Sequence, residues 1–164
     1  MSRFIATFFY IGLLRPAPGT WGSAAAIPVA YLIHATLGPI ALLIATITIF
    51  FIGLWATGNV IRGSENQDPS EVVIDEVVGQ WIPLVAVSFG LSHAGVDPWV
   101  FPYPGWITAF IAFRLFDIWK PGPVGWADRR HGAMGVMLDD VIAGLMAAVV
   151  VMAAAGISHG LLGL

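Results

Sequence analysis

The sequence contains no cysteine and few charged residues, and both shortages limit what the protein can be. Without cysteine the chain has no disulfides, no thiolate metal ligands and no cysteine nucleophile. Charged side chains make up only 10% of its 164 residues, whereas hydrophobic residues make up 58% and the mean hydropathy is +0.85. Soluble domains carry roughly a quarter charged residues. The composition therefore predicts a single domain, residues 1–164, that is integral to a membrane.

The chain also lacks any block of basic residues. It has 7 Lys and Arg against 10 Asp and Glu, which gives a formal net charge of −3. Neutralising a phosphate backbone requires clustered Lys and Arg. We therefore exclude nucleic acid as a partner.

Long uncharged runs alternate with short polar segments, which predicts an all-α, polytopic membrane helix bundle with about five membrane-embedded helices. Residues 23–61 are almost free of charge and are interrupted by Gly38-Pro39, so we expect a hairpin of two helices there. Three further helices are expected at 72–89, 105–119 and 139–158, joined by loops at 90–104 and 121–138.

Residues 2–14 have a basic start and an apolar middle, as a signal peptide would. Arg15 closes this run, and the following PAPGTWGS is typical of a loop and a helix start rather than of a cleavage site. We expect a short N-terminal interfacial helix, or a short buried one, instead.

Basic residues gather at one end of this layout, with Arg114 about two turns inside it and none in the opposite loop. The residues at this end are Arg3, Arg15, Arg62, Lys120, Arg129 and Arg130. By the positive-inside rule this end faces the cytoplasm. Every acid except Asp97 falls near the same face, so a site built from them is expected to be cytoplasmic.

Two pairs of adjacent acids lie at the cytoplasmic ends of two predicted helices: Asp75-Glu76 and Asp139-Asp140. Gly79 follows the first pair, and a face of small residues follows the second, so the two helices can pack closely. Four converging carboxylates repel one another unless a cation binds, and Mg²⁺ prefers such oxygen ligands. The structural alternative is that Asp139 is a helix N-cap and that Asp75 reflects a first-turn preference for acids.

Three further segments favour a phosphate ligand. Arg114, Asp117 and Lys120 are spaced three apart on one helix face. The loop GPVGWADRRHG supplies Asp128, Arg129, Arg130 and His131, and guanidinium groups bind phosphate oxygens in pairs. PAPGTWGS places Thr20 and Ser23 immediately before a helix, where backbone N–H groups and hydroxyls bind anions.

Each of these segments also has a structural alternative. Lys120 can extend to the interface, and Arg114 can simply pair with Asp117. The arginine pair can set topology or bind anionic lipid, and Thr20 or Ser23 can be a plain helix cap.

PGTWGS, VIDEVVGQW and FRLFDIWKPGPVGWADRRHGAMGVMLDDVIAG, in this order, resemble the bacterial phosphatidylglycerophosphatase A family over nearly the whole chain. One departure is Gly132-Ala133, where the family usually has two glycines. The resemblance implies a Mg²⁺-dependent phosphatase in the bacterial inner membrane that converts phosphatidylglycerophosphate to phosphatidylglycerol.

Roles are assigned on both grounds as hypotheses. Asp75, Glu76, Asp139 and Asp140 would hold one or two Mg²⁺. The phosphate would be bound by Thr20, Ser23, Arg114, Lys120 and Arg129. Asp117 or Asp128 would act as base or nucleophile, and His131 would protonate the departing glycerol oxygen. Direct attack by water and a phospho-aspartyl intermediate both stay open.

Two other classes of function are compatible with clustered acids in a membrane protein. An ion or proton carrier would place ionisable residues through the depth of the bilayer, whereas here they gather at one end. A structural or assembly subunit would show no metal dependence.

Overall fold

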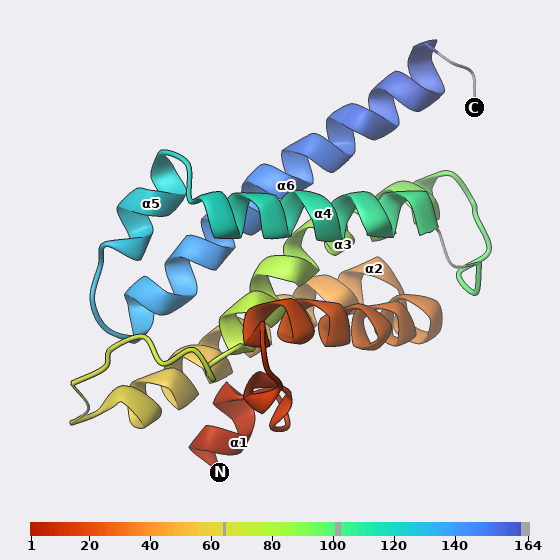
Figure 1. Ribbon diagram of the computed structural model, residues 1–164. Helices are drawn as coiled ribbons and strands as arrows, with labels where there is room; N and C mark the ends of the chain where they lie inside the picture. Colours follow the sequence, from red (N-terminus) through yellow and green to blue (C-terminus); the bar gives the residue numbers. More distant parts are fainter. Residues whose placement is uncertain (64, 101–102, 162–164) are drawn as a thin grey trace.

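The computed structural model describes residues 1–63, 65–100 and 103–161, the last three by their backbone only (Figure 1). Its elements are α1 (Ser2–Ala6), the 3-10 turn η1 (Ile11–Leu13), α2 (Pro18–Ile61), α3 (Ile74–His93), α4 (Tyr103–Trp119), α5 (Pro123–Asp128) and α6 (Ala133–Leu161). These ranges include no strand, so the predicted all-α class is confirmed.

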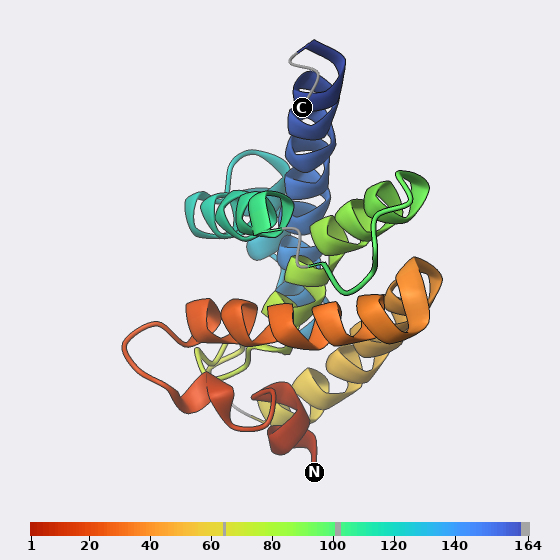
Figure 2. The same cartoon turned by 90° about the vertical axis from the view of Figure 1, so that its right-hand side faces the viewer.

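Helix α2 bends sharply at the predicted break. Gly38 has φ 81° and ψ −178°, a conformation outside the helical region. Pro39 follows it, and a proline ring sterically disfavours helical geometry in the residue before it. Figure 2 shows segment 39–61 returning beneath segment 18–37, so the chain comes back to the end at which α2 began.

Within the described residues, three helices are long and apolar enough to cross a membrane, namely α2, α3 and α6, fewer than the five predicted. Two of the predicted helices form the single bent element α2. Helix α4 has 17 residues and rises about 26 Å, which is short of the roughly 30 Å of a bilayer's hydrocarbon core.

The structure also differs from the sequence-based layout in segment 121–138 and in segment 2–14. The predicted loop 121–138 contains α5 and the first turns of α6, so Asp139 lies inside a helix and is not an N-cap. The expected interfacial helix over 2–14 is helical only in Ser2–Ala6 and in the turn at Ile11–Leu13.

Helices α3 and α6 cross in direct contact at two glycines. A Cβ added to Gly144 would lie 2.4 Å from the carbonyl oxygen of Gly79, and one added to Gly79 would lie 2.8 Å from that of Asp140. Ala143 and Ala147, on the same side of α6, are fully buried. The predicted close packing of the two acidic helices is therefore confirmed, and it brings the two acid pairs together.

Candidate metal and phosphate site

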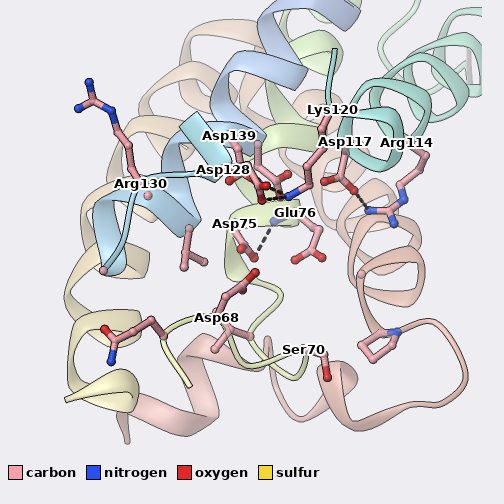
Figure 3. Close-up of a pocket in the computed structure, with 18 of the residues that line it drawn as sticks. Asp68, Ser70, Asp75, Glu76, Arg114, Asp117, Lys120, Asp128, Arg130 and Asp139 are labelled. Carbon is pink, nitrogen blue, oxygen red and sulfur yellow. Dashed lines mark hydrogen bonds and ion pairs between the residues drawn. The ribbon is translucent and has the colours of Figure 1, made fainter. Parts of the chain in front are cut away.

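A pocket of about 350 Å³ lies where the starts of α2 and α3 meet α5, the end of α4 and the first turns of α6 (Figure 3). Ten of the twelve predicted site residues line it: Thr20, Asp75, Glu76, Arg114, Asp117, Lys120, Asp128, His131, Asp139 and Asp140. Ser23 and Arg129 are not among its lining residues.

The carboxylates form two groups that share one residue. Oxygens of Asp75, Glu76 and Asp140 lie within 4.8 Å of one another, and so do oxygens of Asp117, Asp139 and Asp140. Three carboxylate oxygens at this spacing suit a hard divalent cation. All four predicted metal ligands are thus brought together, and Asp117, which was assigned to catalysis, joins them.

Two cationic side chains reach into this acidic cluster. Arg114 Nη1 donates a hydrogen bond to Asp117 Oδ2 over 2.5 Å, which is the pair that the spacing allowed. Lys120 Nζ donates to Asp139 Oδ2 over 2.8 Å and also to Asp128. Burial by itself lowers the pKa of Lys120, but the hydrogen bonds to Asp128 and Asp139 outweigh it and raise that pKa above its ordinary value of 10.5. Lys120 therefore stays charged at neutral pH.

Three polar atoms that belong to lining residues of this pocket are buried without a hydrogen-bond partner among the described residues. They are Glu76 Oε2, Asp139 Oδ1 and Arg114 Nε. Nearly all buried polar atoms in proteins have a partner, so each exception calls for an explanation. Unpartnered carboxylate oxygens and an unpartnered guanidinium nitrogen, on residues that line one pocket, suit a ligand that carries both a cation and an anion.

The start of α2 approaches the acids closely because residue 19 has no side chain. A Cβ on Gly19 would lie 2.1 Å from Glu76 Oε1 and 3.2 Å from Arg114 Nη1. Pro18 occupies the first helical position, which proline favours because it has no N–H to leave unpaired. The prediction that Thr20 and Ser23 precede the helix is therefore wrong, because both lie inside it.

Ser23 acts one turn deeper than Thr20. Its buried hydroxyl donates to the carbonyl oxygen of Gly19 over 2.8 Å and accepts from Arg114 Nη1 over 3.4 Å. Ser23 therefore contacts the guanidinium of Arg114 and does not line the pocket itself.

The sequence predicted that Arg129 binds the phosphate, whereas Arg130 is the arginine of this pair that lines the pocket. The guanidinium carbon of Arg130 lies 3.9 Å from the centre of the Trp126 ring. The neighbours could not be told apart in sequence because both follow the end of α5, outside any helix whose face could place them.

The connection between α2 and α3 adds three polar residues that sequence reasoning missed: Gln67, Asp68 and Ser70. Figure 3 shows Asp68 below Asp75 and Glu76, across the pocket from Lys120. Their polarity indicated only a return to water, and nothing local in the sequence indicates that this connection folds over the acids.

The sequence model of the phosphatidylglycerophosphatase A family matches residues 4–155. Proteins with that name from Escherichia coli and Haemophilus influenzae are each 35% identical to this chain, over 89% and 92% of it and 78% and 86% of their own lengths. A Bacteroides thetaiotaomicron protein named "Putative phosphatidylinositol-3-phosphatase" is 41% identical over 86% of this chain and 85% of its own. No solved structure matches.

Proposed function

The chain belongs to the phosphatidylglycerophosphatase A family, and we propose that it hydrolyses the terminal phosphomonoester of phosphatidylglycerophosphate to give phosphatidylglycerol and phosphate. The observation that carries this proposal is the set of unpartnered buried atoms on Glu76, Asp139 and Arg114, three residues that line one pocket together with further carboxylates and a lysine. A phosphate monoester and a divalent cation would satisfy both kinds of atom at once.

The residues present fit a divalent cation, and we propose Mg²⁺. Asp75, Glu76 and Asp140, and likewise Asp117, Asp139 and Asp140, would hold it through carboxylate oxygens, the ligands that Mg²⁺ prefers. When bound, such a cation polarises phosphoryl oxygens and lowers the pKa of a coordinated water. Among the residues that the structure describes, the ion pairs to these carboxylates come from Arg114 and Lys120, so the cluster retains an excess of negative charge without a metal.

Positive charge for the phosphate would come from side chains that already point into the pocket. Arg114 and Lys120 lie on the end of α4, and each is fixed by at least one carboxylate. The first N–H groups of α2, near Thr20, offer hydrogen bonds to phosphate oxygens. Ser23 would support Arg114. From the α5–α6 turn, Arg130 lines the pocket, but its guanidinium lies over the Trp126 ring and points away from the acids in Figure 3, so it would turn inward to reach a phosphate; Arg129 lies outside the lining.

Proton transfer is assigned to residues at the mouth of the pocket. His131 lines it from the turn before α6 and is exposed, so it can exchange protons with water and protonate the departing glycerol oxygen. Asp117 and Asp128 are the two candidates for base or nucleophile. Asp117 is held in place by its ion pair with Arg114, and Asp128 by its ion pair with Lys120.

We further propose that the chain crosses the bacterial inner membrane several times, with the pocket at the cytoplasmic face. Exposed large apolar side chains on α2, α4 and α6 support this, such as Leu37, Ile118 and Val149. The basic residues of the polar connections lie at the pocket's end of the bundle. Acyl chains of the substrate would then follow the apolar faces, and only the headgroup would enter the pocket.

The test is phosphate release by the detergent-purified protein, with Mg²⁺ and with EDTA, beside the variant Asp140→Asn. The 41% identity to the Bacteroides protein favours one second candidate, a phosphoinositide phosphatase, so phosphatidylinositol 3-phosphate is assayed in parallel. We expect Mg²⁺-dependent release that is faster from phosphatidylglycerophosphate and absent in Asp140→Asn. Faster release from the inositol lipid would favour the second candidate. No release from either lipid would make the carrier hypothesis the next to test, by proton flux in liposomes.

A further inference from the structure

Residues 1–15, here called the N-terminal hook, contain a turn of three left-handed residues. Phe8, Phe9 and Tyr10 have φ values of 43°, 58° and 69°. Residues other than glycine rarely adopt this region, and three in succession persist only where surrounding contacts hold them. The buried Thr7 hydroxyl supplies such contacts, because it donates to the carbonyl oxygen of Arg3 over 2.8 Å and accepts from the N–H of Tyr10 over 3.1 Å.

The consequence of this turn is an outward-facing group of aromatic rings. Phe8 points into the core and is 6% exposed, whereas Phe9 is 60% and Tyr10 53% exposed. The ring of Phe4 meets those of Phe9 and Tyr10 edge-on, at centroid distances of 4.9 and 5.3 Å. We call Phe4, Phe9 and Tyr10 the aromatic tip. A turn held in a disfavoured conformation so that apolar rings face outward indicates that the rings meet something other than water.

The base of the hook is joined to the segment that leads into the acidic site. The N–H of Val73 donates to the carbonyl oxygen of Ala6 over 2.9 Å, and Arg3 pairs with Glu71 over 2.9 Å. A Cβ on Gly12 would lie 2.0 Å from the carbonyl oxygen of Glu71, so the two backbones touch. Figure 1 shows α1 at the side of the bundle, close to where α2 begins. The position of the hook and the position of Asp75 are therefore coupled.

The charges and apolar residues around the tip indicate what it meets. Arg3 and Arg15 flank it in the sequence and are both exposed, and Leu13 and Leu14 extend its apolar surface. Aromatic rings with a hydroxyl, next to basic residues, suit the headgroup layer of an anionic bilayer. A protein partner would require neither the basic flanks nor this mixture of phenyl and phenol groups.

We infer that the N-terminal hook is an interfacial anchor. Its aromatic tip enters the headgroup layer of an anionic phospholipid bilayer, and its base fixes segment 71–73, and with it Asp75 and Glu76, at the depth of the lipid phosphates. The anchor itself is independent of the reaction; its effect on turnover rests on the proposed function.

The absence of cysteine allows a direct test of depth. Phe9→Cys in the full chain is labelled with an environment-sensitive fluorophore and reconstituted in phosphatidylethanolamine–phosphatidylglycerol vesicles that contain nitroxide lipids. Glu65→Cys, in the polar connection before α3, is the matched exposed control. We expect headgroup-level nitroxides to quench the label at position 9 and not at position 65. Equal quenching at both positions, or stronger quenching at position 9 by nitroxides at the chain ends, would overturn the anchor. Tyr10→Cys replaces Phe9→Cys if that variant does not fold.

A kinetic test separates the anchor from the reaction. The double variant Phe9→Ser/Tyr10→Ser is expected to hydrolyse long-chain phosphatidylglycerophosphate in vesicles roughly tenfold more slowly, while it hydrolyses a dissolved dihexanoyl analogue at the unmodified rate. Trp99→Ser, an exposed aromatic in the α3–α4 connection, is the control that should change neither rate. Equal losses on both substrates would mean that the hook serves folding, against the inference. If the unmodified protein hydrolyses neither substrate, the proposed function fails while the depth measurement still decides the anchor.

Discussion

Gly19 and Glu76 lie so close together that no side chain fits between them, because a Cβ on residue 19 would stand 2.1 Å from Glu76 Oε1. The start of one helix and an acid of another are thereby held in a single contact. Glu76 Oε1 is the end of a flexible side chain, so it can swing away from a methyl group at little cost to the fold.

Gly19→Ala is therefore expected to lower activity far more than stability. The displaced carboxylate leaves its metal group, while the free energy of unfolding changes by less than about 1 kcal/mol. Phosphate release and thermal unfolding in detergent measure the two effects. Gly90→Ala is the control, because no atom lies within 4 Å of its added Cβ. Equal activity in the two variants would show that the position of Glu76 is unimportant.

Asp140→Asn should weaken Mg²⁺ binding more than Asp75→Asn does. Asp140 belongs to both carboxylate groups, whereas Asp75 belongs to one. We expect affinity to fall at least about a hundredfold for Asp140→Asn, measured by calorimetric titration. Asp97→Asn, in the α3–α4 connection, should leave affinity unchanged. The idea of a shared ligand fails if the two site variants bind Mg²⁺ alike.

Lys120→Met should raise the affinity for Mg²⁺ while lowering turnover. The ammonium competes with a cation for Asp128 and Asp139, so its removal leaves carboxylates that attract metal more strongly. In the absence of metal, the variant should lose about 1–2 kcal/mol of stability, a partly exposed pair being worth less than a buried one. Lys120→Arg is the matched control, since it keeps the charge. A fall in affinity for Lys120→Met would contradict this role.

The pH dependence of the Lys120 contribution follows from the direction of its pKa shift. Because the folded pKa is raised above the ordinary 10.5, its stabilisation is fully present below that ordinary value and is lost only as pH rises through the raised value. The stability difference between the unmodified protein and Lys120→Met, measured by unfolding in detergent without metal, should therefore show no step from Lys120 across the neutral range.

Arg130→Ala should raise KM for the lipid substrate roughly tenfold, and Arg129→Ala should raise it less. Arg130 lines the pocket, and its guanidinium, which lies over the Trp126 ring, would turn toward a bound phosphate. Steady-state phosphate release from mixed micelles compares the two variants. A larger effect for Arg129 would restore the sequence-based assignment.

The meeting of the two acid pairs could be predicted because Gly79 and the small face of α6 are visible in the sequence as positions where helices approach. The start of α6 could not be predicted, because the helix that precedes it, α5, has only 6 residues. A helix this short shows no hydrophobic periodicity that would distinguish the segment from a loop. Asp68 was missed for another reason: its contribution depends on how the α2–α3 connection folds over the pocket, which is a long-range contact. In the part of the chain that the structure describes, three helices and not five are long and apolar enough to cross a membrane, because the two helices predicted in 23–61 are joined at Gly38 into one bent element and α4 has only 17 residues.

Asp140 joins two carboxylate groups that would otherwise be separate. A cation held by either group would draw on Asp140, so occupancy of one group would change the affinity of the other. A metal titration of this protein would then trace two unequal, linked affinities, and a curve for independent positions would fail to describe it.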